Sequence, residues 1–441
     1  MQVDGKVKAV LCITVALSFA FGVYLFRKAP DREPAPQSPA AHQFADWEHA
    51  TEPEPPSPAV SPAPSAVEMR DLPGKKDFSN SLAGYLRHLA EQPGVVPGEL
   101  LLKFRFASDI AALRSRAGSL GLTVLWSDSR LNAARIAYTN SDALAEELQS
   151  NSEAYEDIGP NLVMRIPGLP AEPEIDSENP GGSVPFREAL MESIGANQDR
   201  SQWGEGVTVA ILDSGVLDHP SLKNVEVTRF DLSNSDEING HGTAMASLVA
   251  GQVYPAEGIA PASSLLDLRI TDKNGVSNTG LVAEGILSAA DQGANVINIS
   301  LGALGDSAVL RAAIEYARER NIVVVAAAGN EQVTQLAFPA AYSGVISVGA
   351  VDAENTQAYF SNSGETLSIS APGVGIVSAY KEGQLVMGSG TSQATAITSG
   401  VVSALLSRGY QAGDILQILE QHAFQTGAPR AQVGAGVIRI P

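Results

Sequence analysis

The stretch Val207-Thr208-Val209-Ala210-Ile211-Leu212-Asp213-Ser214-Gly215 is an apolar run that ends in an acidic residue and a glycine turn. Continuous apolar residues without alternation are typical of a strand buried on both faces, as in a parallel sheet. Similar runs recur downstream, separated by amphipathic helical patterns. Strands are predicted over 207–212, 265–270, 296–301, 322–327 and 345–351, and helices over 243–250, 281–292, 307–320 and 392–406. This alternation predicts an α/β fold in which helices flank a parallel sheet.

Four short motifs carry side chains suited to acyl transfer by a serine. They are Asp213-Ser214-Gly215, His241-Gly242-Thr243, Ala328-Gly329-Asn330 and Gly390-Thr391-Ser392. A serine hydroxyl needs an imidazole to take its proton, and that imidazole needs a carboxylate to orient it. Ser392, His241 and Asp213 supply these groups. The side-chain amide of Asn330 and the backbone N–H of Ser392 can stabilise the negative charge on the substrate carbonyl oxygen.

The positions of these residues in the predicted elements strengthen this interpretation. Asp213 and Asn330 lie just beyond the carboxyl ends of predicted strands, where open α/β sheets place their sites. Ser392 begins an apolar helical run, so the positive end of a helix dipole lies beside the developing charge. Each residue alone is an ordinary turn or cap residue. Together and in this order they predict one catalytic site.

The motifs resemble those of the subtilisin-type (subtilase, S8) serine proteases, and the likeness extends over about 186–441. It includes the stretch 296–302 and Ala371-Pro372-Gly373. The resemblance implies a subtilisin-like sheet and a serine endopeptidase that acts on proteins or peptides. It also implies two sets of substrate-binding residues. The set that pairs with the substrate backbone is Ser300, Leu301 and Gly302. The set that lines the pocket for the residue before the cut is Ala327, Ala328 and Gly329.

The sequence departs from the family pattern around the site. Ala244 replaces a second histidine after His-Gly-Thr, and Ala396 with Ile397 replaces a Pro-His pair after the serine. Ser221 stands in the loop where the family often has a calcium-binding aspartate, and the segment 249–258 offers few oxygen ligands. We therefore expect no cofactor and no metal ligands. Calcium binding remains possible, but the strong site of the family is expected to be missing.

The composition limits the partners and the redox chemistry. The chain has 441 residues, enough for two or three domains, and a formal charge of −20 from 29 basic and 49 acidic residues. Phosphate binding needs a basic surface, so this charge argues against a nucleic-acid partner. Cys12 is the single cysteine, which excludes an intrachain disulfide. It lies in an apolar segment, which also excludes a cysteine nucleophile.

The N-terminus carries an uncharged apolar run, Ala9 to Phe26, flanked by basic residues. Its length of 18 residues exceeds an ordinary signal-peptide core and approaches a spanning helix. We favour a membrane anchor within 1–28 over a cleaved signal peptide. In either case the following chain is expected outside the cytoplasm. The Pro-rich stretch 29–94 predicts a disordered spacer, although a ligand for a Pro-recognition domain is an alternative.

The next region, 95–167, shows the order βαββαβ. Strands are predicted over 100–106, 122–126, 133–138 and 162–166, and helices over 108–120 and 142–150, with a further possible helix over 81–90. This order predicts a small α+β, ferredoxin-like domain, an antiparallel sheet with two helices on one face. Its opening, 97–104, resembles the inhibitor-like propeptides of subtilisin-type precursors. The resemblance implies that it assists folding, blocks the active site with its C-terminal tail and is then removed. A permanent small domain is the alternative.

The acidic, Gly- and Pro-rich segment 168–185 is predicted to be an exposed linker that the enzyme itself cuts, and 186–441 to be the catalytic domain. The sequence leaves two alternative functions. The run from Gly390 to Ala394 loosely resembles the serine elbow of esterases, but only His422 follows Ser392, and esterases need an acid and then a histidine there. An inactive protease scaffold that binds partners at the cell surface is the more serious alternative, although no triad member is missing.

Overall fold

The computed structural model describes residues 67–68, 78–167, 183–233, 235 and 237–441. The predicted N-terminal anchor, nearly all of the Pro-rich stretch before residue 78 and most of the linker 168–185 lie outside these residues. Within the described ranges, no helix combines the length and the apolar character needed to cross a membrane.

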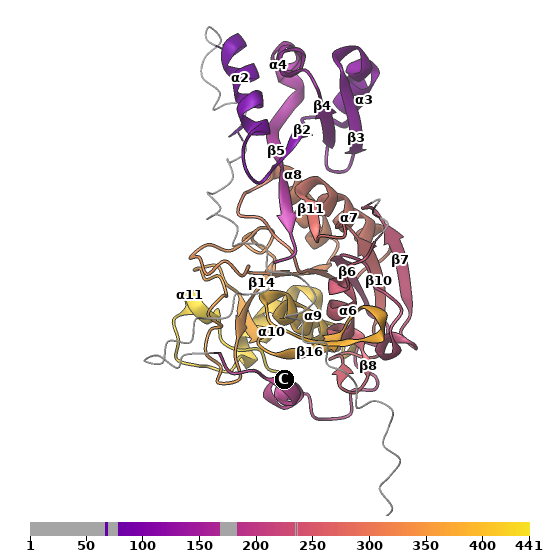
Figure 1. The fold of residues 1–441 in the computed structure, drawn as a ribbon, viewed down its shortest axis with the longest axis vertical. Helices are drawn as coiled ribbons and strands as arrows, with labels where there is room; N and C mark the ends of the chain where they lie inside the picture. The colour runs from indigo at the N-terminus through magenta and orange to yellow at the C-terminus, as the bar shows by residue number, and fades with distance from the viewer. Residues whose placement is uncertain (1–66, 69–77, 168–182, 234, 236) are drawn as a thin grey trace, which may run out of the picture. The chain divides into compact units, whose positions relative to one another are not determined.

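The larger part of the chain is built on a sheet of seven parallel strands in the order β15-β14-β13-β12-β6-β10-β7 (Figure 1). This confirms the predicted α/β fold. In chain order, the strands are β6 Thr208–Asp213, β7 Val227–Asp231, β10 Ser264–Arg269, β12 Val296–Ile299, β13 Val323–Ala327, β14 Ile346–Val351 and β15 Ile369–Pro372. Two of them, β7 and β15, were not predicted. Both are edge strands, and β7 is exposed or half-buried along its length, so it lacks the continuous apolar pattern.

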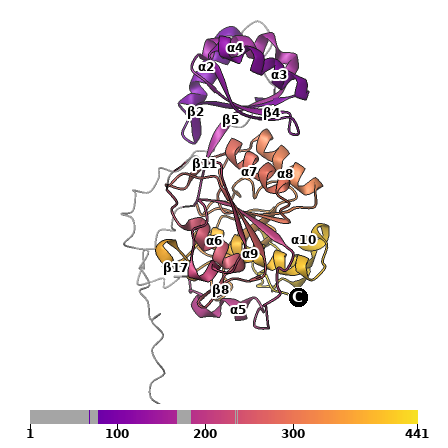
Figure 2. The same cartoon turned by 90° about the vertical axis from the view of Figure 1, so that its right-hand side faces the viewer.

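Helices cover both faces of this sheet, as Figure 2 shows. They are α6 His241–Ala250 and α9 Thr391–Ser407 on one face, and α7 Thr279–Asp291 and α8 Ala308–Glu319 on the other. Successive residues of β6 alternate between the two cores. Val209 and Ile211 pack in the core that contains α6 and α9, whereas Ala210 and Leu212 pack in the core that contains α7 and α8. Burial on both faces explains the unbroken apolar run from which the fold was predicted.

The order of the strands places the site. From β6 the chain runs to β7 and β10 on one side of the sheet, and α7 then carries it across β6 to β12 on the other side. The crossovers therefore change direction between β6 and β12. Asp213 is the last residue of β6, and Ser300 directly follows β12. Ligands of open α/β sheets bind at such a switch point, outside the carboxyl ends of the strands.

A second, antiparallel sheet precedes this one, in the order β1-β5-β2-β4-β3. Its strands are β1 Val67–Glu68, β2 Val95–Phe104, β3 Leu122–Asp128, β4 Ala133–Tyr138 and β5 Tyr155–Arg165. Helices α3 Ala107–Arg116 and α4 Ser141–Ser150 complete the βαββαβ order and share one core with the sheet. This agrees with the predicted ferredoxin-like arrangement. A third helix, α2 Phe78–Ala90, joins the same core and matches the possible helix over 81–90. The domain therefore begins before residue 95, within the stretch that was predicted to be a spacer.

Strand β5 is longer than the sequence predicted, because it begins at Tyr155 rather than at Leu162. Its first half contains acidic residues, Gly159 and Pro160, which resemble a turn, but Asp157 and Gly159 pair in register with Lys103 and Leu101 of β2. Neighbouring strands thus override a weak local strand propensity.

The far end of β5 continues beyond its own sheet. It pairs antiparallel with β11 Val276–Asn278, where Met164 lies opposite Ser277. Asn161 accepts hydrogen bonds from the hydroxyl of Thr279 and from the backbone N–H of Gly280, at 3.1 and 3.0 Å, at the start of α7. These contacts bring the last residues of β5 close to the stretch that follows β12.

Candidate active site

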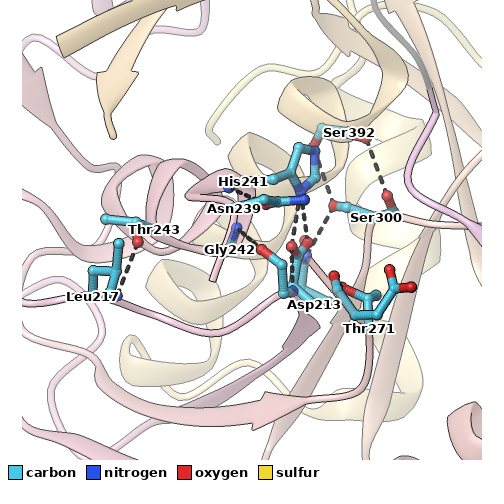
Figure 3. A network of polar contacts seen from close by, with 12 residues as sticks. Asp213, Leu217, Asn239, His241, Gly242, Thr243, Thr271, Ser300 and Ser392 are labelled. Carbon is cyan, nitrogen blue, oxygen red and sulfur yellow. Dashed lines mark hydrogen bonds and ion pairs between the residues drawn. The ribbon is translucent and has the colours of Figure 1, made fainter. Parts of the chain in front are cut away.

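Asp213 and His241 form a hydrogen-bonded pair at the centre of the site (Figure 3). The imidazole Nδ1 lies 2.9 Å from both carboxylate oxygens of Asp213. Asp213 is fully buried, while the side chain of His241 is 13% exposed. An ionised carboxylate only accepts hydrogen bonds, so Nδ1 carries the proton and Nε2 of the neutral ring is left as a proton acceptor.

The loop after β6 packs against the start of α6, which carries His241. The backbone N–H of Gly242 donates to the hydroxyl of Ser214 at 3.0 Å, and the N–H of His241 donates to the side chain of Asn239 at 2.9 Å. A Cβ on Gly242 would lie 2.6 Å from the carbonyl oxygen of Gly215, so only glycine permits this approach. The glycine of the His-Gly-Thr motif therefore has a packing role.

Ser392 is the second residue of α9 and is 3% exposed. Figure 3 shows the imidazole of His241 between Asp213 and Ser392, so the structure brings the three predicted residues together. The Ser392 hydroxyl donates a hydrogen bond to the carbonyl oxygen of Ser300 at 3.2 Å. That carbonyl, and not the imidazole, is its partner among the described residues.

Asn330 follows β13 and is held by the start of α9. Its Oδ1 accepts hydrogen bonds from the backbone N–H and the hydroxyl of Thr391, at 2.9 and 2.8 Å. Its Nδ2 has no hydrogen-bond partner in the part of the chain that the structure describes. A Cβ on Gly390 would lie 3.1 Å from this nitrogen, so glycine keeps the space beside it open. The amide is thus oriented by its oxygen and is able to donate through its nitrogen.

The first predicted set of substrate-binding residues contacts the start of α9 through Ser300, whose hydroxyl donates to the carbonyl oxygen of Ser392 at 3.4 Å. Ser300 and Leu301 are buried, and Gly302 forms two backbone hydrogen bonds with Arg165, at 3.1 and 3.2 Å. The second set, Ala327, Ala328 and Gly329, ends β13 and leads into Asn330. The N–H of Gly329 donates to the hydroxyl of Thr391 at 3.3 Å, so this set also contacts the start of α9.

Sequence reasoning missed several residues that support the site. Thr391 lies within the motif of Ser392, and Asn239 lies two residues before His241, so their closeness to the motifs was a signal for these hydrogen bonds. Asn362 offers no such local signal. It donates to the carbonyl oxygen of Ala328 at 3.1 Å from a position 34 residues along the chain. Such long-range partners are visible only once the loops are placed.

The loop expected to lack calcium ligands is occupied by local hydrogen bonds. His219 lies 2.9 Å from the hydroxyl of Ser221 through Nδ1 and 3.0 Å from the carbonyl oxygen of Gln384 through Nε2. Burial lowers the pKa of His219 below its ordinary value. Across the described ranges, no three His, Cys, Asp or Glu side chains are grouped so that they could hold a metal ion.

Comparison with known proteins agrees with this architecture. The model of the subtilase family (Peptidase S8) matches residues 204–436. A thermophilic serine proteinase of Bacillus sp. strain AK1 is 31% identical over 345 residues, which cover 76% of this chain and 84% of that protein. Thermitase of Thermoactinomyces vulgaris is 39% identical over 228 residues, which cover 50% of this chain and 82% of that enzyme.

Solved structures show the same fold. The crystal structure of fervidolysin from Fervidobacterium pennivorans, a keratinolytic enzyme related to subtilisin, aligns with a TM-score of 0.66 over 78% of this chain. This chain spans 60% of the length of fervidolysin, at 23% identity, so that likeness concerns the fold alone. The prenylagaramide maturation protease PagA aligns with a TM-score of 0.50 at 32% identity, over 53% of this chain and 91% of that protease.

Proposed function

Because the chain belongs to the subtilase family and is a serine endopeptidase, we propose that Asp213, His241 and Ser392 form its catalytic triad. The observation that carries this proposal is the position of His241 Nδ1, 2.9 Å from both carboxylate oxygens of the buried Asp213. An imidazole held in this way presents Nε2 as a base, and Ser392 lies beside it at the start of a helix.

The proposed reaction cuts a peptide bond in two steps. His241 Nε2 takes the proton of Ser392 as Oγ bonds to the carbonyl carbon of the substrate, and the carbonyl π electrons move onto its oxygen. Nδ2 of Asn330 and the N–H of Ser392 donate to this oxyanion. As it collapses, the C–N bond breaks and the imidazolium protonates the leaving amine. Water then hydrolyses the acyl-enzyme by the same route, which restores Ser392.

One movement must precede this chemistry. The Ser392 hydroxyl donates to the carbonyl oxygen of Ser300, so it has to turn toward the imidazole before it can transfer its proton. We propose that the Ser392 side chain turns about χ1, between staggered rotamers. Hydrogen bonds of a catalytic site often tighten only when substrate is bound.

A fluorophosphonate probe, which reacts with an activated serine, tests the proposal. We expect the processed protein to be labelled at pH 8 and to cleave a fluorogenic peptide, and Ser392→Ala to do neither. Ser403→Ala is the matched control, because Ser403 is buried on the same helix and its hydroxyl lies 2.7 Å from that of Ser263, away from the proposed triad. A folded wild-type protein without label would instead favour the inactive, partner-binding alternative.

The N-terminal sheet is proposed to inhibit this site in the precursor. The last residues of β5 support the proposal, since Arg165 exchanges two backbone hydrogen bonds with Gly302 and the N–H of Ile166 donates to Gly275 at 2.9 Å. An antiparallel register that pairs Arg165 with Gly302 brings Pro167 opposite Ser300. The tail thus occupies the edge at which a substrate backbone is expected to pair.

We further propose that the enzyme removes this segment by cutting within 168–185. Ser392→Ala should accumulate as the uncut precursor on an SDS gel, while Ser403→Ala should be processed like the wild type. Adding active enzyme to the Ser392→Ala precursor separates cutting in trans from cutting in cis. Normal processing of the mutant expressed alone would contradict self-processing.

The segment 1–28 is proposed to anchor the precursor in a membrane, with the protease outside the cytoplasm. The expected observation is a protein that stays in the membrane fraction after a carbonate wash and whose catalytic part is reached by external protease. A catalytic part released into the medium with a new N-terminus near residue 28 would favour the cleaved signal peptide instead.

A further inference from the structure

The peptide groups of Val216, three residues beyond Asp213, are held by charged side chains from two strands. The N–H of Val216 donates to Oδ2 of Asp267 on β10 at 2.8 Å. Its carbonyl oxygen accepts from Nε of Arg229 on β7 at 3.0 Å. The two side chains lie 4.0 Å apart, as a loose ion pair. Together they bind both polar groups of one buried residue.

The loop that contains Val216 is also tied to the start of α6, on both sides of the held residue. Before Val216, the hydroxyl of Ser214 accepts from the N–H of Gly242 at 3.0 Å. After it, the N–H of Leu217 donates to the hydroxyl of Thr243 at 2.9 Å. A displacement of Val216 would therefore be passed to the helix turn that carries His241, as well as to Asp213 itself.

Asp267 is an acidic residue in a buried position that destabilises its charged form. It is 3% exposed, and its Oδ1 has no hydrogen-bond partner among the residues that the structure describes. Burial, aided by the negative charge of Asp213, raises the pKa of Asp267 to about 7. A buried carboxylate with one oxygen unsatisfied destabilises a fold relative to a neutral side chain of the same shape. Stability alone does not explain an aspartate here.

We propose that Asp267 is a positioning residue that, with Arg229, fixes the loop at Val216 so that Asp213 and His241 keep their hydrogen bond. The inference rests on the proposed triad. Asp267 touches none of the reacting groups, so its effect passes through Val216 and the loop. Loss of Asp267 should therefore lower turnover and leave the affinity for substrate unchanged.

The charge of Asp267 gives this role a signature in the pH profile. The groups that face it are Arg229 from β7, Arg269 from its own strand, Asp213 from β6 and the N–H of Val216. Above about pH 7 the carboxylate adds a second negative charge beside that of Asp213. A negative charge favours the cationic state of a nearby base. Removing the charge of Asp267 should therefore move the acid limb of kcat/KM to lower pH.

Two substitutions separate geometry from charge. In Asp267→Asn the carbonyl oxygen of the amide still accepts from Val216 but the charge is gone; in Asp267→Leu both are lost. We expect Asp267→Asn to keep kcat within about threefold and to move the acid limb of kcat/KM to lower pH. Asp267→Leu should show the same shift and lose about ten- to hundredfold in kcat, with KM unchanged. Glu226→Gln is the control, since it removes a charge just before β7 at an exposed side chain, and the amide oxygen can still accept the hydrogen bond from Ser264.

Melting temperatures at pH 8 complete the test. Because the folded-state pKa of Asp267 is raised, its ionisation costs stability as pH rises from about 4 to about 7, so Asp267→Asn should melt no lower than the wild type. The inference is overturned if both variants keep the wild-type kcat and acid limb. A lower melting temperature of Asp267→Asn with unaltered kinetics also overturns it, by indicating a purely structural role. Failure of the proposed function is distinct, because the wild type itself would then be inactive and unlabelled.

Discussion

The proposed acid–base half of the site and its proposed nucleophile half are held in different ways. Asp213 and His241 are already joined, with Nδ1 at 2.9 Å from both carboxylate oxygens. Ser392 bonds to the backbone carbonyl of Ser300, and Asn330 uses only its oxygen, on Thr391. The charged half is complete without substrate, whereas the neutral half still has a hydroxyl to turn and an amide nitrogen to engage.

The difference follows from the free energy that each buried group loses when it has no hydrogen-bond partner. A fully buried carboxylate such as Asp213 is strongly unfavourable without a donor, so its pairing with His241 is fixed as the chain folds. A neutral hydroxyl loses only about 1 kcal/mol when it gives up one hydrogen bond, and it regains most of that with a new acceptor. The Ser392 hydroxyl is therefore the adjustable part of the site. Substitutions in the two halves should therefore lower kcat by different amounts and for different reasons.

Ser392→Ala should have the largest effect. Without Oγ there is no covalent step, so we expect kcat to fall by about 10⁶, the magnitude known for loss of the serine in subtilisin. Alanine fits the buried position on α9, so binding of peptide substrates should persist. Single-turnover kinetics with a fluorogenic peptide measures the loss. A residual kcat above one hundredth of the wild type would show that another residue supplies the nucleophile.

Asp213→Asn should come next, with kcat lower by about 10⁴, the magnitude known for this change in serine proteases. The amide donates where the carboxylate accepts, so the imidazole adopts the wrong tautomer and Nε2 is no longer a base. Steady-state kinetics at pH 8 on protein with a native circular dichroism spectrum checks this. An equal loss in Glu226→Gln, at an exposed side chain just before β7, would indicate that net charge and not the tautomer is responsible.

The same two halves show how far a sequence can be interpreted. Asp213, His241, Asn330 and Ser392 could be proposed as site residues because each lies in a short motif at the end of a strand or the start of a helix. The sheet could be predicted because its central strands are buried on both faces and are continuously apolar. The edge strand β7 lacks that pattern, because Thr228 and Arg229 are exposed, and it was therefore not predicted.

The supporting partners could not be predicted for a different reason. Asp267 lies inside the predicted strand 265–270, and nothing local reveals that its carboxylate accepts from Val216, in the loop that follows the neighbouring strand β6. Asn362 reaches the carbonyl oxygen of Ala328 from a distant loop. Such contacts depend on which strands are neighbours and in which register, and local propensity does not specify either. Sequence therefore predicts the groups that react better than the groups that hold them.

Asn330→Ala should lower kcat by about 10² to 10³, the range known for the corresponding donor in subtilisin. KM should change little, because the amide nitrogen engages the oxygen only as it becomes negative. Asn330→Asp sharpens the test. Aspartate keeps the oxygen that accepts from Thr391 but has no donor, so it should be at least as impaired as alanine. A nearly active aspartate variant would remove Asn330 from the oxyanion site.

The smallest predicted effect concerns Thr391, which links the two sides of the nucleophile half. Its hydroxyl donates to Asn330 at 2.8 Å and accepts from the N–H of Gly329 at 3.3 Å. Valine has nearly the same shape but no hydroxyl, so Thr391→Val loses both bonds, while the backbone N–H still holds Asn330 at 2.9 Å. One neutral hydrogen bond contributes about 1 kcal/mol, so we expect kcat to fall by about three- to tenfold.

Thr391→Ser is the matched control, because serine retains the hydroxyl and loses only the methyl group. It should keep turnover near the wild-type value, and combining Thr391→Val with Asn330→Ala should cost no more than Asn330→Ala alone, since the hydroxyl then has no amide to orient. Additive losses in the double variant would mean that Thr391 acts independently of Asn330. The nucleophile half would then be held by α9 as a whole, and the contrast with the directly bonded pair of Asp213 and His241 would be weaker.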